Sequence, residues 1–362
     1  MSKSHYIIPI FVPHEGCPHN CVFCNQNSIT GASNKVDAKF VKETIDKYLV
    51  NINIEKSIVE VSFYGGTFTA IPMEKQRELL SVAKTYKENG KINYIRLSTR
   101  PDYIDRTILD NLKKYSVDII ELGVQSLDEE VLLKSGRGHS ENDVINASAL
   151  IKEYGFTLGH QIMIGLPGDT FKKDIETTLK VINIGPSIAR IYPALVIRNT
   201  PMEIMYNSSS YKPYSLMDAV KISKVLYGLF TNSHINVIRM GLQPTEEINE
   251  GREIISGPFH PAFRELVESS IINDMLLEEI GHLKSKSITI CINPREISKL
   301  YAYKKKFFND MKEHINTKTI IIQQMESLSE GTYMVKHDSV SKILSKYEYI
   351  NKKYKEGNLS II

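Results

Sequence analysis

The sequence predicts an α/β protein with a parallel sheet or barrel, and three observations favour this fold class. Short apolar segments alternate with helical patterns over the first 240 residues. These segments are mostly apolar and both of their faces look buried, as is usual for parallel strands. Gly, Pro and polar residues gather in the turns after the strands, which is where barrels of parallel strands build their active sites.

The expected strands are short and rich in Ile, Val and aromatic residues. They lie at residues 6–12, 58–64, 94–98, 118–124, 158–165, 187–196 and 235–239. Helical patterns occupy residues 38–49, 73–86, 103–114, 141–154, 171–182 and 215–230. Pro72, Pro101-Asp102 and Ser140 stand just before three of these helices, where start signals are expected.

The chain divides into three expected parts. Residues 1–240 form the barrel, residues 241–283 form a linker or lid with a helix, and residues 284–362 form a small domain. The last part reads strand, helix, helix, strand, strand. This order suggests a KH-like RNA-binding module, in which the basic Tyr301–Lys306 loop would contact phosphates. A small α/β cap without RNA binding is the alternative.

Composition and charge narrow the class of protein. With 42% hydrophobic and 24% charged residues, the chain resembles a soluble globular protein. We find no apolar run that would span a membrane and no signal peptide, so we expect a cytoplasmic protein. The net charge of +3 hides an uneven distribution, because fifteen Lys and Arg face eight Asp and Glu after residue 280.

Three cysteines within eight residues are the strongest signal in the sequence. Cys17, Cys21 and Cys24 follow the first expected strand with C-x3-C-x2-C spacing. Such a loop can hold three irons of a [4Fe–4S] cluster and leave the fourth iron open for a small ligand. A structural zinc site completed by His14 or His19 is the alternative. Cys291 lies within an apolar strand pattern and is expected to be a buried hydrophobic residue.

This string resembles the radical S-adenosylmethionine (radical SAM) superfamily. The resemblance implies a partial (β/α)6 TIM-type barrel and SAM bound at the open iron, where reductive cleavage yields a 5′-deoxyadenosyl radical. Gly65, Gly66 and Thr67 stand where the family carries a Gly-Gly-Glu-like segment that contacts the methionyl amino group. Thr67 replaces the acidic residue. Phe23 is expected to pack against the adenine.

More specifically, residues 5 to about 270 resemble the radical SAM half of the Elongator catalytic subunit and its bacterial and archaeal relatives. The shared strings are Ser98–Asp102, Glu121–Ser126, Gly136–His139, Gly165–Gly168, Arg190–Pro193 and Gly241–Thr245. The resemblance implies modification of wobble uridines in tRNA. Nothing after residue 270 resembles the acetyltransferase domain of that family, so acetyl transfer is not expected here.

Polar residues at successive strand ends are the remaining candidates for the site. For SAM, these are Ser98 and Arg100 at its carboxylate or ribose, Gln125 at the ribose hydroxyls, and Gln161 with Met163 on one face of a strand. His160 would face the other way. Arg190 and Tyr192 would point inward as catalytic residues, with Tyr192 as hydrogen donor or radical relay. Arg137 and His139 would contact an anionic substrate.

We therefore expect a radical SAM enzyme that modifies RNA, with tRNA as the expected substrate. An electron donor such as flavodoxin or ferredoxin would supply the reducing electron. Two alternatives stay open: a radical SAM enzyme that acts on a small molecule or a peptide, and an RNA-binding protein with a structural zinc site.

Overall fold

The computed structural model describes residues 4–12, 17, 19, 21–25, 36–242, 253–317 and 319–355. The chain forms two compact units. Unit 1 comprises residues 1–214 and 242–259, and unit 2 comprises residues 215–241 and 260–362. The boundaries expected from the sequence, at residues 240 and 283, stay a prediction about how the chain folds. Among the described residues, no helix combines the length and apolar character needed to cross a membrane.

Unit 1 is an alternating β/α structure, as its sequence pattern predicts. Its elements are β1 (Ser4–Val12), α2 (Ala38–Leu49), β2 (Ser57–Gly65), α3 (Met73–Glu88), β3 (Tyr94–Thr99), α4 (Arg106–Lys114), β4 (Ile119–Gln125), α5 (Glu129–Lys134), α6 (Glu141–Glu153), β5 (Thr157–Ile164), α7 (Phe171–Ile184), β6 (Ile188–Pro193), β7 (Val196–Ile197), α8 (Pro201–Asn207) and β9 (Ile254–Ser256).

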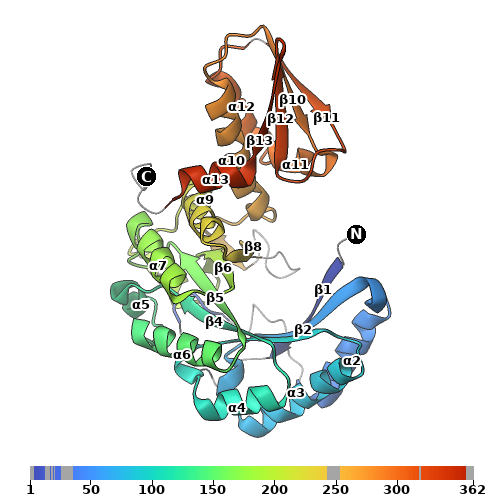
Figure 1. Ribbon diagram of the computed structural model, residues 1–362. Coiled ribbons are helices and arrows are strands. Elements are labelled where there is room, and N and C mark those ends of the chain that lie inside the picture. The colour runs from blue at the N-terminus through green and yellow to red at the C-terminus, as the bar shows by residue number, and fades with distance from the viewer. Residues whose placement is uncertain are drawn as a thin grey trace. The chain divides into compact units, whose positions relative to one another are not determined.

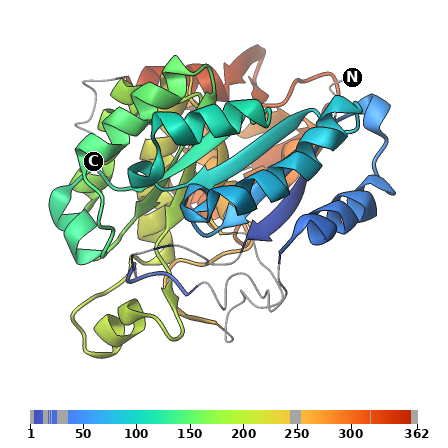
Figure 2. The same cartoon turned by 90° about the horizontal axis from the view of Figure 1, so that it is seen from below.

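Strands β1 to β6 pair in sequence order, and every printed pairing among them is parallel. The sheet they form curves, and helices α2 to α7 cover its outer face (Figure 1). Figure 2 shows the same helices from below, lying across the strands. This is the curved, partial barrel that the family resemblance implies.

Strands β2 to β6 of the curved sheet separate apolar from polar side chains. In β2, the buried Val59, Val61 and Phe63 alternate with Glu60 and Ser62. The same alternation recurs in β3 to β6, where Ile, Leu and Val residues pack under the helices. Strands β2 to β6 are largely buried on both faces, as predicted, but their inner face is polar, and in β1 Ile7 and Phe11 are exposed. That inner face supplies side chains to the candidate site.

Unit 2 joins a helical part to a small mixed sheet. Its elements are α9 (Leu216–Asn232), β8 (Asn236–Met240), α10 (Phe263–Ile280), β10 (Ser287–Ile292), α11 (Ile297–Leu300), α12 (Lys306–Glu313), β11 (Thr319–Gln324), β12 (Thr332–His337), β13 (Val340–Ser345) and α13 (Lys346–Lys353).

The small sheet has the strand order β11-β10-β12-β13. Strand β10 pairs in parallel with β11 and antiparallel with β12, which in turn pairs antiparallel with β13. Its core includes Ile288, Ile290 and Tyr333, which pack with residues of α10. The expected order of strand, helix, helix, strand and strand is present. The KH-like comparison stays a prediction.

Candidate functional site

The cysteine loop follows β1, at the start of the curved sheet. The backbone N–H of Cys24 donates to the carbonyl of Cys21 at 3.0 Å, which closes a tight turn between the second and third cysteines. Cys21 is 5% exposed, whereas Cys17 and Cys24 are partly exposed. His14, one of the two histidines considered for a zinc site, lies outside the described residues.

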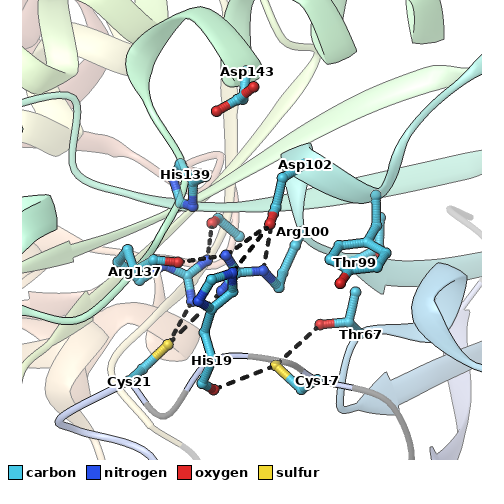
Figure 3. A network of polar contacts seen from close by, with 12 residues as sticks. Cys17, His19, Cys21, Thr67, Thr99, Arg100, Asp102, Arg137, His139 and Asp143 are labelled. Atoms are coloured by element: carbon cyan, nitrogen blue, oxygen red, sulfur yellow. Dashed lines mark hydrogen bonds and ion pairs between the residues drawn. The ribbon is translucent and has the colours of Figure 1, made fainter.

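The cysteine loop is docked on the segment Ser135–Gly138, which follows α5. Arg137 Nη1 donates to Cys21 Sγ at 3.2 Å, and the Val22 N–H donates to the Ser135 carbonyl at 3.1 Å (Figure 3). Gly138 has a φ of +70°, and a Cβ added there would lie 2.3 Å from the His19 ring. The positive φ favours glycine at this position, and a side chain there would also have to displace the His19 ring.

The turn after β2 reaches the first cysteine. The Thr67 hydroxyl donates to Cys17 Sγ at 3.5 Å, so the residue that replaces the family's acidic one contacts a cysteine thiol. Gly65 has a φ of +113°, and a Cβ there would lie 2.2 Å from the Val12 carbonyl oxygen. The Gly66 N–H donates to the same oxygen at 3.2 Å. The two glycines thus let β1 and β2 approach closely where the cysteine loop begins.

Arg100, which directly follows β3, contacts Asp102, the Arg137 carbonyl and Cys21. It forms a bidentate pair with Asp102 at 2.9 and 3.0 Å and also donates to the Arg137 carbonyl. Its Nη1 lies 3.9 Å from Cys21 Sγ.

His139 lies close to both arginines. Burial, together with the positive charges of Arg137 and Arg100, lowers the pKa of His139 to about 3, so this imidazole is neutral near pH 7.

A second cluster fills the interior of the curved sheet and centres on Glu121. Arg190 Nε and Nη2 donate to its two carboxylate oxygens at 2.5 and 2.9 Å. Arg96 bridges Glu121 and Glu60, and its Nη2 lies 2.8 Å from Glu60 Oε2. These four charged side chains are each less than 10% exposed. Opposite charges balance within the cluster, as buried ions require.

Polar side chains predicted for the site join this second cluster. Gln161 Nε2 donates to Glu121 at 2.8 Å and to the Ser98 hydroxyl at 3.2 Å. Arg190 donates to the phenol oxygens of Tyr192 at 3.2 Å and Tyr64 at 3.0 Å. His160 faces away from this cluster, as its place in the alternation predicts. It lies 2.9 Å from the Ser148 hydroxyl on α6.

Three other predicted residues, Phe23, Met163 and Gln125, make none of the hydrogen bonds described so far. Phe23 and Met163 both pack against one apolar cluster that includes Leu166 and Val196. Gln125, at the end of β4, adopts a left-handed backbone with a φ of +65°. Its buried Oε1 has no hydrogen-bond partner among the described residues, so it is available to a ligand's donor.

The sequence did not identify Glu60, Arg96 and Glu121 as residues of the site. It predicted that Arg137 would contact an anionic substrate. The structure turns the Arg137 side chain inward to Cys21 and Gly123, where it is 5% exposed. A signal for the first three residues was present. Each is a single charged residue inside an apolar strand, which is costly unless an opposite charge lies on a neighbouring strand.

The residues around the cysteine loop suit an iron–sulfur cluster and a bound cosubstrate. Three thiols come from one short loop, and two guanidinium groups face Cys21. Within the described part of the chain, no three His, Cys, Asp or Glu side chains are already gathered to hold a metal ion.

Family models match most of the chain. The model described as the Radical SAM superfamily matches residues 11–182, and the Radical_SAM C-terminal domain matches residues 186–273. The first match contains the three cysteines, Arg100, Arg137 and the Glu121 cluster up to Gln161. The second begins just before Arg190.

Relatives with curated names are similar over part of their length. The chain is 32% identical over 208 residues to an uncharacterised protein of Methanocaldococcus jannaschii, covering 54% of this chain and 63% of that one. It is 27% identical over 256 residues to the tRNA uridine(34) acetyltransferase of Methanocaldococcus infernus, covering 60% and 48%. It is 30% identical over 178 residues to Elongator complex protein 3 of Saccharomyces cerevisiae, covering 43% and 32%. The chain thus spans less than two thirds of each of these relatives.

A solved structure shows the same fold. The archaeal Methanocaldococcus infernus Elp3 with an N-terminal deletion superposes with a TM-score of 0.60 at 21% identity, covering 76% of this chain and 64% of that one. The family matches, this shared fold and the C-x3-C-x2-C loop at the end of β1 agree with one another. The chain therefore belongs to the radical SAM superfamily of enzymes, whose cofactors are a [4Fe–4S] cluster and SAM.

Proposed function

We propose that Cys17, Cys21 and Cys24 hold the [4Fe–4S] cluster and that SAM binds beside it, at the end of the curved sheet. The docking of the cysteine loop on Arg137 and Gly138 is the observation that carries this assignment. When bound, the cluster and SAM would supply a 5′-deoxyadenosyl radical that takes a hydrogen atom from the substrate. The chain would hold the thiolates, orient SAM and exclude water.

The contacts of SAM are assigned to the polar ends of the strands. Gly65, Gly66 and Thr67 would receive the methionyl amino group, because their turn already reaches Cys17. Gln125 would bond the ribose hydroxyls, and its unpartnered Oε1 supports this role. Ser98 would contact the carboxylate or the ribose.

Other SAM contacts depend on groups that are already engaged. Arg100 is assigned to the carboxylate, although Asp102 holds its guanidinium in a bidentate pair. Gln161 is held by Glu121 and so would present a fixed amide to SAM. Phe23 and Met163 would contact the adenine, since both border one apolar cluster.

Arg190 and Tyr192 are assigned to the substrate. Arg190 donates to the Tyr192 phenol oxygen at 3.2 Å, which holds the ring of Tyr192 beside the Glu121 cluster. We assign Tyr192 the role of hydrogen donor or radical relay. The charge of Arg190 is balanced by Glu121, which holds the guanidinium in one orientation.

The cluster assignment is tested with single Cys→Ala substitutions at Cys17, Cys21 and Cys24. Each variant is reconstituted without oxygen, assayed for iron and sulfide, and reduced with dithionite in the presence of SAM. We expect loss of the cluster and of 5′-deoxyadenosine formation. Cys291→Ala is the matched control, because Cys291 is buried in β10 of unit 2 and should leave both unchanged. Zinc in place of iron would reject the proposal.

We further propose that the substrate is RNA, with tRNA as the expected class, and that flavodoxin or ferredoxin donates the electron. Two curated relatives are a tRNA uridine(34) acetyltransferase and Elongator complex protein 3, which supports this choice. In unit 2, Lys304 and Lys305 lie between α11 and α12 and Lys306 begins α12, and all three are exposed. These lysines suit phosphate groups.

The RNA substrate is tested by mass spectrometry of tRNA nucleosides from cells with and without the protein. We expect one modified nucleoside to disappear with the protein and to return with the wild-type chain but not with Cys21→Ala. Binding of tRNA to the purified protein should weaken as salt rises. An unchanged nucleoside profile together with salt-independent binding would reject an RNA substrate.

A further inference from the structure

Arg137 is a buried cation with no carboxylate beside it. Its side chain is 5% exposed. Among the residues that the structure describes, no Asp or Glu forms an ion pair with it, whereas neighbouring Arg100 is paired with Asp102. A buried guanidinium without an anion is costly. Asp102 acts on Arg137 only through space, as the partner of Arg100, whereas Arg137 Nη1 makes direct contact with Cys21 Sγ.

The direction of the Arg137 side chain is fixed from several sides. Nη2 donates to the Gly123 carbonyl of β4 at 2.6 Å, which aims Nη1 at Cys21 Sγ at 3.2 Å. The carbonyl of Arg137 accepts from Arg100 (Figure 3). Arg137 is thus held before any cluster binds.

The cysteine that Arg137 faces becomes a thiolate when it ligates iron. A hydrogen bond from a cation to a cluster sulfur, and the net charge around the cluster, are two of the features that set its reduction potential. Reduction adds one electron, and so one negative charge, to the cluster. A fixed positive charge in a poorly solvated site stabilises that added charge more than it stabilises the oxidised form.

We propose that Arg137 is a positioning residue that docks Cys21 and, as the unpaired buried cation, raises the reduction potential of the cluster. This inference rests on the proposed assignment of the cluster to Cys17, Cys21 and Cys24. It assigns Arg137 to the cluster instead of the substrate. Arg100 contributes less to the potential, because Asp102 neutralises it and its Nη1 is 3.9 Å from Cys21 Sγ.

The test is an anaerobic redox titration of the full-length protein without SAM, followed by electron paramagnetic resonance of the reduced cluster. Arg137→Gln removes the charge and keeps an amide donor. Arg137→Lys keeps the charge and loses the paired guanidinium donors that contact Cys21 and the Gly123 carbonyl. Arg106→Gln removes an exposed arginine of α4 that pairs with Glu153 and serves as the matched control. Circular dichroism and iron content are measured on each variant.

For Arg137→Gln we expect at least a tenfold lower ratio of reduced to oxidised cluster at a fixed potential, which is a shift of 59 mV to more negative values. Arg137→Lys should recover most of that shift, and Arg106→Gln should match the wild type. Loss of the cluster from folded Arg137→Gln, with retention in Arg137→Lys, would equally support the proposal.

Other outcomes overturn it. Equal midpoint potentials in the wild type and Arg137→Gln would remove the electrostatic role while leaving the cluster assignment intact. The same drop in Arg137→Lys and Arg137→Gln, or loss of the cluster from both folded variants, would reject the role of the charge, because the lysine keeps the charge and loses only the paired donors of the guanidinium. A wild-type protein without an iron–sulfur signal would instead reject the proposed function itself.

Discussion

At the residue scale, the backbone angle and the close neighbours of position 65 leave no space for a side chain, so only glycine fits there. Its φ of +113° disfavours a side chain, and a Cβ would overlap the Val12 carbonyl oxygen at 2.2 Å. We expect Gly65→Ala to lower the free energy of unfolding by at least about 2 kcal/mol more than Gly90→Ala does. Gly90 has a φ of +71° but open space around it, so it isolates the backbone cost. Urea unfolding of both variants provides the comparison, and equal losses would contradict the overlap.

Also at the residue scale, His160 links stability to pH. Burial, with a smaller effect from Lys152, lowers the pKa of this histidine from 6.5 to about 3. The unfolded chain takes up a proton below about pH 6.5, and the folded chain does not until about pH 3. The stabilisation is therefore complete above that window and is lost as the pH falls, by up to about 1.4 kcal/mol per pH unit.

We expect the free energy of unfolding of His160→Gln to fall less steeply between pH 6 and pH 4 than that of the wild type, because roughly one fewer proton is taken up on unfolding. Urea unfolding at a series of pH values measures this slope. His314→Gln, which changes an exposed histidine, is the control and should retain the wild-type slope. His139 has a similarly lowered pKa and titrates in the same window, so some slope should remain. Identical slopes in all three proteins would show that His160 is not the source.

The residues of the site differed in how readily the sequence revealed them. Cys17, Cys21 and Cys24 carry their function in their spacing, and Tyr192 and Arg190 could be placed by the period of two in a strand. Arg137 could not, because its direction depends on the Gly123 carbonyl of a strand that lies earlier in the chain. Contacts between segments far apart in sequence are not encoded in any local pattern.

At the scale of elements, α6 marks where the segment that docks the cysteine loop ends. Ser140 caps the helix in a capping box with Asp143. We expect Ser140→Ala to cost about 1 kcal/mol of stability, because it exposes backbone donors at the first turn. Ser81→Ala, at an exposed position inside α3, should be neutral or slightly stabilising. Thermal unfolding of both variants tests this, and a neutral Ser140→Ala would mean that Asp143 alone suffices.

The elements of the curved sheet were predictable and the short ones were not. Strands β1 to β6 each carry apolar residues that pack under helices, so each strand could be recognised from its apolar pattern in the sequence. The expected strand at 187–196 ends at Pro193, and residues Val196–Ile197 pair with β9 instead. Proline lacks an N–H to continue a ladder, which is a physical reason for an early end. Strand β13 is largely exposed and gives little hydrophobic signal.

At the scale of the whole molecule, binding of the cluster should affect the two units differently. All three cysteines belong to unit 1, and a ligand stabilises the structure that binds it. We expect hydrogen exchange, measured by mass spectrometry, to slow after reconstitution at residues 17–25, 65–69 and 135–139. Strands β10 to β13 of unit 2 should exchange as before. The Cys21→Ala chain, treated in the same way, is the control. Uniform protection of both units would contradict this expectation.

The ionic cluster inside the curved sheet has a consequence for which sequences this fold can accept. Glu60, Arg96, Glu121 and Arg190 share their hydrogen bonds in a chain, so no member can change alone without stranding a charge on its neighbour. We therefore expect a substitution at one of these four positions to be tolerated only when a second substitution restores the charge balance. The interior of the sheet behaves as one electrostatic unit, whereas single changes outside these four side chains leave that balance intact.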